Sequence, residues 1–309
     1  MTYDNNITTQ RNAEWIKRCE DNFADSIRRI AEDICKKREL RIVRLFGPTC
    51  SGKTTAANIL ISVFESLGKR AHIVSIDDFY YDRETLLEMS RAKGLEVVDY
   101  DSPDTIDAAA LHAFADEIFD SDEVHCPIFD FSLGRRNGYK TLSIDENDIF
   151  IFEGIQANYP NVKEILSEHG SASIFIIPES RVIVGGVEIL PQRLRLMRRL
   201  VRDFLFRSSD PEFTLDLWRS VRDNEDKNIF PYASESDYFV DSTMEYEVGV
   251  LKPYLCEILG GIGEDSRHYP RAQEILNLIE HVEPISRELI LPHYLYRCGK
   301  NRYLYREFV

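Results

Sequence analysis

The sequence lacks the features that identify several classes of protein. Its six cysteines include no pair spaced as CxxC, which argues against a zinc site and against a disulfide framework. No apolar run approaches the roughly 18 residues that a membrane span requires. The opening residues, MTYDNNITTQRNAEW, contain no apolar core of a signal peptide. We therefore expect a cytoplasmic protein with no membrane partner.

Positive charge is also scarce. The 38 lysines and arginines are outnumbered by 53 aspartates and glutamates, which gives a formal net charge of −15. A protein that binds nucleic acid regardless of its sequence needs a basic face, so we expect no nucleic-acid partner. One local basic cluster can still bind a phosphate, because its field can override the overall deficit.

Apolar and amphipathic segments alternate along the chain. Hydrophobic residues make up 43% of the 309 residues, which is enough for a sizeable core. Short apolar runs predict strands at 41–47, 71–76, 148–154, 173–178 and 237–242. Helical periodicity predicts helices at 11–37, 54–69, 105–119 and 194–207, and a mostly helical tail from about residue 262. This alternation indicates a parallel sheet with helices on both faces.

A glycine-rich loop follows the first predicted strand. In LFGPTCSGKTTAANI, residues 45–59, the residues Gly47, Gly52, Lys53 and Thr54 fit the pattern G-x-x-x-x-G-K-[ST] between a strand and a helix. Backbone N–H groups at such a helix start can hold a phosphate. We predict a nucleoside triphosphate site in which Lys53 bridges the β- and γ-phosphates, Thr54 ligates Mg²⁺, and Lys53 faces solvent when no ligand is bound. The alternative is a turn that fits by chance.

Carboxylates follow two of the predicted strands. Asp77 and Asp78 come just after 71–76, and Glu153 ends the run 148–154. Ligands of open parallel sheets bind outside the carboxyl ends of the strands. An aspartate here can accept a proton from a substrate hydroxyl or help to hold Mg²⁺, and Glu153 can hold a metal-bound water. The alternatives are that the aspartates cap the next helix and that Glu153 is a solvated strand-end carboxylate.

The predicted helix 194–207 is strongly basic. Six arginines lie between residues 193 and 207, against the single acidic residue Asp203. Arg195, Arg199 and Arg202 fall on one helical face. In an acidic chain, this pattern predicts a lid that closes over phosphates. The alternative is a helix docked on acidic neighbours.

Seven segments, in order from about residue 40 to 258, together resemble the uridine kinase and phosphoribulokinase family of P-loop kinases. They are GPTCSGKTT, SIDDFYYD, YDSPDTID, CPIFDFSLGRR, IFEGI, RRLVRDFLFR and YEVGVLKPYL. The tail, with VEPIS and a closing REFV, resembles a bacterial uridine kinase-like branch that is often fused to an N-terminal TGS domain. No such domain fits in the 40 residues that come before the first predicted strand.

The resemblance implies a fold and a division of the chain. The implied fold is a three-layer α/β P-loop NTPase fold with a parallel sheet, an arginine-rich helical lid, and helical N- and C-terminal extensions. The expected units are a helical extension at 1–40, a kinase domain at 41–260 with its lid at about 193–212, and a mostly helical extension at 261–309.

The resemblance also implies roles for individual residues. Asp77 matches the base that takes a proton from a 5′-hydroxyl, Asp101 matches the residue that holds the ribose hydroxyls, and Glu153 matches the glutamate near Mg²⁺. The expected catalytic residues are Asp77, Lys53, Arg199 and Arg202. The expected ATP-binding residues are Gly47, Pro48, Thr49, Cys50, Ser51, Gly52, Lys53, Thr54, Thr55 and Arg207. The expected acceptor-binding residues are Tyr80, Asp101, Phe129 and Arg136, and the expected metal ligands are Thr54 and Glu153.

Two positions depart from the family pattern. Uridine–cytidine kinases carry a tyrosine where Phe129 stands and a histidine where Gly134 stands, and those side chains read the pyrimidine base. Phenylalanine cannot donate a hydrogen bond, and glycine has no side chain to do so. We expect an ATP- and Mg²⁺-dependent kinase of a nucleoside-like acceptor, with uridine or cytidine as the leading candidate. The alternatives are another alcohol or a sugar phosphate as the acceptor, and a non-catalytic regulatory module. The sequence leaves a homo-oligomer open.

Overall fold

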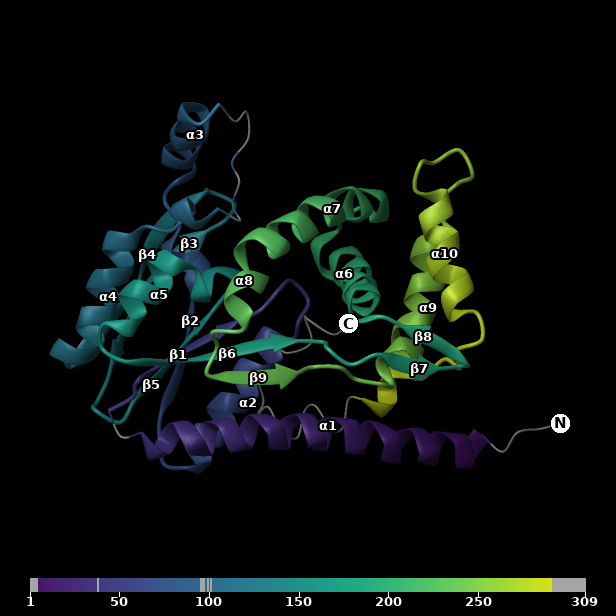
Figure 1. Cartoon of the computed structure of the whole chain (residues 1–309), viewed down its shortest axis with the longest axis horizontal. Helices are drawn as coiled ribbons and strands as arrows, with labels where there is room; N and C mark the ends of the chain where they lie inside the picture. The colour runs from purple at the N-terminus through teal and green to yellow at the C-terminus, as the bar shows by residue number, and fades with distance from the viewer. Residues whose placement is uncertain (1–4, 38, 95–97, 99, 101, 291–309) are drawn as a thin grey trace.

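A five-stranded parallel sheet forms the centre of the computed structural model, which describes residues 5–37, 39–94, 98, 100 and 102–290 (Figure 1). The strand order is β2-β5-β1-β6-β9, and every neighbouring pair is parallel. The strands are β1 (Ile42–Phe46), β2 (Ala71–Ser75), β5 (Ile149–Glu153), β6 (Ser171–Ile177) and β9 (Tyr238–Asp241). The five strands predicted from apolar runs are confirmed, and so is the three-layer α/β fold.

Apolar residues cover both faces of the sheet, which explains why its strands read as continuous apolar runs. In β5, Ile149 and Ile151 join the core on one face, and Phe150 and Phe152 join the core on the other. The first face is covered by α1 (Asn5–Lys36) and α2 (Lys53–Ser66), and the second by α4 (Ala108–Asp120) and α5 (Pro160–Ser167). Two helical layers with a sheet between them make the three layers.

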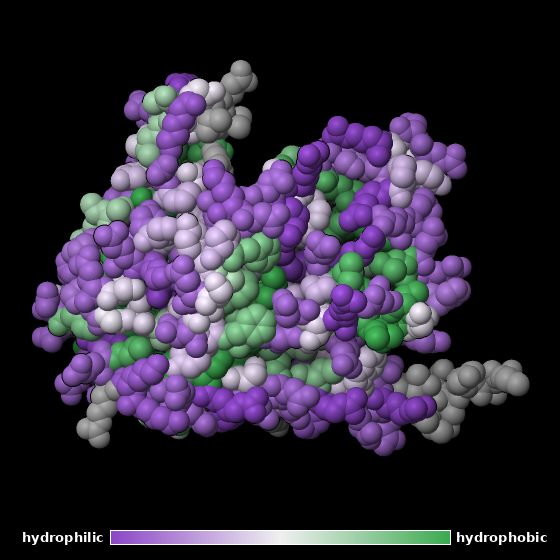
Figure 2. Space-filling model, in the orientation of Figure 1, coloured by the Kyte–Doolittle hydropathy of each residue, from purple (hydrophilic) through white to green (hydrophobic). Residues whose placement is uncertain are grey.

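The N-terminal helix α1 packs along α2 and β9. Its apolar residues Ile16, Phe23, Ile27 and Ile34 are buried in the core that α1 shares with α2, as their spacing predicts. Figure 2 shows hydrophilic residues along the face of α1 that is turned outward. No helix among the described ranges is long and apolar enough to cross a bilayer.

A third apolar core lies beyond the sheet and unites elements of the second half of the chain. It contains residues of α6 (Pro191–Arg207), α7 (Pro211–Asn228), α9 (Glu247–Gly260) and α10 (Tyr269–Ile279), and of the hairpin formed by β7 (Val182–Val184) and β8 (Val187–Ile189). The helical character expected from residue 262 is present in α10 and in the short η4 (Arg287–Leu289). The helix α8 (Phe230–Ala233) connects α7 to β9.

An antiparallel hairpin was not predicted from the sequence. It joins β3 (Glu123–Asp130) to β4 (Arg135–Ser143), and α3 (Arg83–Ala92) lies beside it in Figure 1. Most residues of β4, RRNGYKTLS, are exposed, so the strand carries no alternation of apolar and polar residues. Short 3₁₀ turns follow two strands of the sheet, η1 (Ile76–Phe79) after β2 and η3 (Ile155–Asn158) after β5, and a third, η2 (Pro103–Thr105), comes before α4.

Candidate active site

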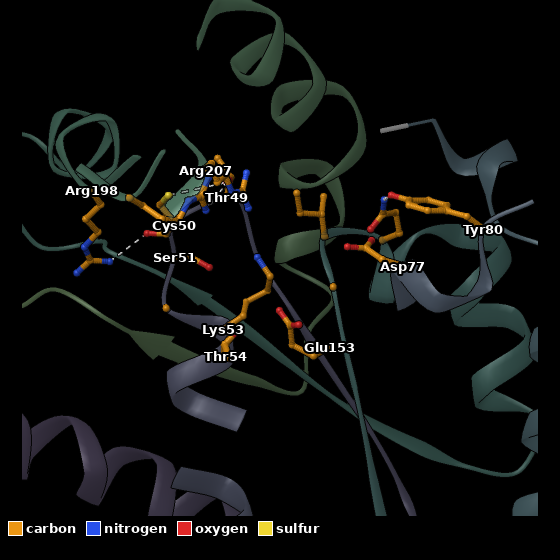
Figure 3. Close-up of a pocket in the computed structure, with 15 residues that line it drawn as sticks. Thr49, Cys50, Ser51, Lys53, Thr54, Asp77, Tyr80, Glu153, Arg198 and Arg207 are labelled. Carbon is orange, nitrogen blue, oxygen red and sulfur yellow. Dashed lines mark hydrogen bonds between the residues drawn. The ribbon is translucent and has the colours of Figure 1, made fainter. Parts of the chain in front are cut away.

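Three neighbouring strands bring several of the predicted site residues together at one edge of the sheet. β5 lies between β2 and β1, and Glu153 at its end is in register with Ser75 of β2 and Leu45 of β1. The loop after β1 and Asp77 after β2 therefore flank Glu153. They surround a cavity of about 240 Å³ (Figure 3). Its lining residues are Thr49, Cys50, Ser51, Gly52, Lys53, Thr54, Asp77, Tyr80, Glu153, Gly154, Ile155, Gln156, Arg198, Arg202 and Arg207.

The glycines of the loop after β1 are required by its backbone. A Cβ atom at Gly47 would lie 2.1 Å from the carbonyl oxygen of Ile176 in the adjacent strand β6, so only glycine fits there. Gly52 has φ of 88°, in the left-handed region, and comes directly before α2. The loop can therefore turn tightly from the end of β1 into the start of a helix, where free N–H groups favour an anion.

Lys53 does not face solvent, so that prediction is wrong. Its side chain is buried, and Nζ donates hydrogen bonds of 3.1 Å to the carbonyl oxygens of Gly47 and Pro48. A buried ammonium group without acceptors is costly. The carbonyls of the loop stabilise the charge and hold it beside the cavity, from which a phosphate oxygen can replace them.

The basic helix α6 packs directly on this loop. Arg195 donates to the carbonyl of Thr49 at 3.0 Å, and Arg198 donates to the carbonyl of Cys50 at 3.1 Å. Arg202 lies 3.5 Å from the hydroxyl oxygen of Thr49. These contacts fix α6 above the loop. Closure of the helix as a lid stays a prediction.

Acidic residues neutralise most of the arginines of α6. Arg195 pairs with Glu225 of α7, and Arg198 pairs with Glu247 of α9 at 2.7 Å. Arg199 and Arg202 both pair with Asp203. The helix is thus docked on acidic neighbours, as the alternative interpretation of the sequence has it, while it also contacts the loop.

The arginines differ in their access to the cavity. Arg202 and Arg207 line it, as expected of residues that meet phosphates. Arg199, also among the predicted catalytic residues, is not among the lining residues. Arg198 does line the cavity and was not among the predicted site residues, although it is one of the six arginines between residues 193 and 207.

The structure distinguishes the two aspartates that follow β2. Asp77 lines the cavity, where burial raises the pKa of its carboxyl. A hydrogen bond from Tyr80 and the charges of Lys53 and Arg207 oppose this rise in the pKa. Asp78 is directed elsewhere and accepts the backbone N–H of Phe129 at 3.0 Å. Of the two, only Asp77 is placed to act on a bound hydroxyl.

The raised pKa of Asp77 predicts a gain in stability when the charge is removed. When the pKa of a carboxyl is higher in the folded than in the unfolded state, the folded protein loses stability as the pH rises. The loss begins near the ordinary pKa of 3.8 and continues through the pKa of the folded state. Asp77→Asn should therefore unfold at a higher temperature than the wild type at pH 7, and the difference should vanish near pH 3. Thermal unfolding across this range measures it. A variant less stable at pH 7 would contradict the assignment of a desolvated carboxylate.

The predicted acceptor residues lie in different places. Tyr80 lines the cavity, whereas Phe129 is buried edge-on against the Tyr80 ring, with 5.8 Å between ring centroids. Arg136 forms an ion pair with Asp107 and is not among the lining residues. Asp101 lies outside the described residues.

Gly134 has no room for a side chain. Its φ is +66°, and a Cβ atom there would lie 2.7 Å from Nε of Arg83. Arg83 also donates to the carbonyl of Phe131 at 3.2 Å. An arginine thus occupies the space beside Gly134, which the sequence did not indicate.

Oxygen ligands for a metal ion are available on the cavity wall. Thr54 supplies a hydroxyl, and Glu153 and Asp77 supply carboxylates. Within the described ranges, no three His, Cys, Asp or Glu side chains form a cluster that could hold a metal by themselves. A hydroxyl and one or two carboxylates fit Mg²⁺, which is usually bound by one or two carboxylates together with phosphate oxygens and water.

Gln156 is a lining residue that the sequence analysis missed. It follows β5 in η3, and the residue is only 2% exposed. Its amide nitrogen donates to the hydroxyl oxygen of Tyr80 at 2.6 Å. Nothing in the local sequence marks it, because its partners are distant in the chain.

The sequence of the chain is similar to those of known proteins. Residues 42–248 match the family model described as "Phosphoribulokinase / Uridine kinase family". A uridine kinase of Mycoplasma genitalium is 27% identical over 184 residues, which are 58% of this chain and 74% of the relative. A uridine kinase of Lactobacillus johnsonii is 26% identical over 212 residues, which are 68% of this chain and 90% of the relative.

A solved structure of phosphoribulokinase from Rhodobacter spheroides aligns with a TM-score of 0.43 and 14% identity. The alignment covers 84% of this chain and 99% of the other. The similarity to this family rests on the sequence matches and not on this structural alignment. The span 42–248 includes the loop after β1, Asp77, Glu153 and the whole of α6.

Proposed function

The chain belongs to the phosphoribulokinase and uridine kinase family of ATP-dependent kinases, and from this premise we propose that it transfers the γ-phosphate of ATP to a hydroxyl of a small nucleoside-like acceptor. The observation that supports this proposal is that one cavity joins the phosphate loop to Asp77. A phosphate and a hydroxyl bound at its two ends would meet between Lys53 and Asp77.

The donor end of the cavity supplies positive charge. Lys53 would exchange its carbonyl partners for phosphate oxygens, and Arg202 and Arg207 would stabilise charge that develops during transfer. Thr54 and Glu153 would hold Mg²⁺, which supplies further neutralisation of the phosphates when bound. Positioning and charge neutralisation are the main requirements of phosphoryl transfer.

The acceptor end supplies the base. Asp77 would take the proton of the attacking hydroxyl, and its raised pKa makes it a stronger base than an ordinary carboxylate. Tyr80 contacts Asp77 through its hydroxyl and would help to hold the carboxylate in place.

At Phe129 and Gly134, this chain has no counterpart of the side chains that read the base in uridine kinases. Phe129 is buried behind Tyr80, and Arg83 fills the space beside Gly134. Uridine and cytidine remain the leading acceptors because the relatives are uridine kinases. We infer that discrimination between bases is weak. Because Phe129 and Gly134 cannot supply the polar contacts that read a base, another small alcohol or a sugar phosphate is the second candidate.

An acceptor panel tests this function. ADP release with ATP and Mg²⁺ should be stimulated by a ribose-type acceptor, and mass spectrometry of the product should show one added phosphate. Values of kcat/KM should differ by less than about 10²-fold between pyrimidine and purine nucleosides, since larger ratios need dedicated polar contacts.

Three other results would each change the conclusion. A larger preference for uridine and cytidine would show that other residues read the base. A preference for sugar phosphates would favour the second candidate. ADP release that no acceptor stimulates would favour a regulatory module.

A further inference from the structure

The N-terminal helix α1 lies outside the span that matches the family model, yet it is attached to the segment 242–247, where β9 leads into α9. Tyr246 of this segment donates a hydrogen bond to the carboxylate of Glu20 in α1 at 3.2 Å, and both residues are buried. Glu245 accepts a hydrogen bond of 3.1 Å from the indole N–H of Trp15. The segment is thus joined to α1 at two points.

The same segment supplies acceptors for Arg198 of α6. The guanidinium of Arg198 donates to both carboxylate oxygens of Glu247 at 2.8 Å and to the carbonyl of Ser242 at 2.9 Å. Its third nitrogen, Nη1, donates to the carbonyl of Cys50 in the phosphate loop at 3.1 Å (Figure 3). Because a guanidinium is planar and rigid, its contacts with the segment determine where Nη1 lies.

The backbone of Cys50 has a conformation that needs such support. Its φ is +57°, in the left-handed region, which is unfavourable for residues other than glycine. A conformation of this kind persists only where the surrounding structure enforces it. Cys50 lines the cavity together with Ser51 and Gly52, so a relaxed backbone at Cys50 would alter the wall against which phosphates would bind.

We propose that Tyr246 is a positioning residue, through which α1 keeps the phosphate loop in the conformation that binds ATP. This inference rests on the proposed function, in which the loop after β1 holds the phosphates of ATP. Neither Tyr246 nor Glu20 lines the cavity, so both act on the nucleotide through the residues between them and the loop. In order from α1 to the loop, the path consists of Glu20, Tyr246, Ser242, Glu247, Arg198 and Cys50.

Binding of ATP with Mg²⁺, measured by calorimetry without any acceptor, tests this inference. Tyr246→Phe removes the hydroxyl that meets Glu20 and keeps the aromatic ring in the core. Loss of one hydrogen bond corresponds to about 3- to 10-fold in an equilibrium constant. We expect Tyr246→Phe to weaken ATP binding by about threefold or more, and the double variant with Trp15→Phe to weaken it by about tenfold. If binding weakens in this way while no acceptor is phosphorylated, the inference holds and the proposed acceptor function fails.

Tyr238→Phe is the matched control. The hydroxyl of Tyr238 donates to the carboxylate of Asp33 and accepts a hydrogen bond of 3.1 Å from the ammonium group of Lys37. It therefore also joins α1 to the last strand of the sheet, but it lies at the start of β9, before the segment 242–247. The control makes the same chemical change as Tyr246→Phe and should leave ATP binding unchanged.

Arg198→Lys tests the last part of the path. Lysine keeps a positive charge for Glu247 but has a single nitrogen, so it cannot meet Glu247, Ser242 and Cys50 as the guanidinium does. This variant should itself weaken ATP binding, and adding Tyr246→Phe to it should have no further effect. If the losses of the two variants add, the path through Arg198 is wrong.

Steady-state kinetics with whichever acceptor the panel identifies separate positioning from a general loss of structure. Contacts of the loop with phosphates are made in the ground state and the transition state alike, so in Tyr246→Phe the KM for ATP should rise while kcat stays within about twofold. A fall in kcat with an unchanged KM, or equal weakening of ATP binding in Tyr246→Phe and Tyr238→Phe, would make Tyr246 merely structural. Normal ATP binding in the folded double variant would overturn the role of α1.

Discussion

Lys53→Met should remove most of the phosphoryl transfer activity in a protein that still folds. Lys53 carries the charge nearest to the loop carbonyls of Gly47 and Pro48, where phosphates would bind, and methionine keeps its length without that charge. Loss of one preorganised electrostatic contact to the transferred group costs about 10²- to 10³-fold in turnover. We expect a fall of on the order of 10³-fold in ADP release at saturating ATP, because Lys53 carries a full charge.

Lys252→Met provides the matched control. Lys252 also donates to two backbone carbonyls, those of Glu280 and Val282 at 2.6 and 2.8 Å, but it lies in α9 and not on the cavity. It should lose similar hydrogen bonds and retain normal turnover. Near-normal activity in a folded Lys53→Met protein would show that the donor phosphates bind elsewhere.

The sheet and its loop could be predicted because their signals are local. β5 has large apolar residues on both faces, so the four consecutive apolar residues Ile149 to Phe152 report its burial directly. The loop needs glycine at 47 and 52 for reasons of backbone geometry, and those residues appear in the sequence itself. The hairpin of β3 and β4 has no such signal, because β4 is largely exposed and polar.

The environment of the site residues could not be predicted, because it is made by distant segments. Arg195 meets Glu225 from 30 residues further along the chain, and Arg198 meets Glu247 from 49 residues further along. A helical wheel shows the arginines of α6 but not these partners. For the same reason the sequence left open whether this helix is a lid over phosphates or a helix docked on acidic neighbours, and the structure shows the buried ion pairs of the second. Lys53 appeared solvent-facing in the sequence because the acceptors of its charge are backbone atoms.

The buried ion pairs of α6 have a consequence for the cavity. Arg195 and Arg198 each use part of the guanidinium for a carboxylate and part for a carbonyl of the loop. A buried charge that loses its partner is strongly destabilising. Glu225 of α7 and Glu247 of α9 therefore keep Arg195 and Arg198 in place, and these arginines in turn position the loop. The shape of the phosphate site thus depends on α7 and α9, although neither helix lines it.

Asp77→Asn should remove most of the turnover while ATP binding is retained. Asparagine has the size and polarity of aspartate but cannot take a proton at neutral pH. Loss of a general base lowers turnover by about 10²- to 10⁴-fold. Asp77 lies after β2, across Glu153 from the phosphate loop, so nucleotide contacts should change little. Steady-state kinetics with saturating ATP and acceptor, together with nucleotide binding by calorimetry, measure the two effects separately.

The adjacent Asp78 makes this test specific. Asp78→Asn keeps an oxygen that can accept the N–H of Phe129, and Asp78 is not among the lining residues. This variant should have near-normal turnover. A collapse of ATP affinity in Asp77→Asn, with turnover preserved at saturation, would make Asp77 a metal or structural residue instead of the base. If Asp77→Asn instead becomes more stable at pH 7 and loses turnover, the burial of this carboxylate lowers the stability of the fold and serves proton transfer.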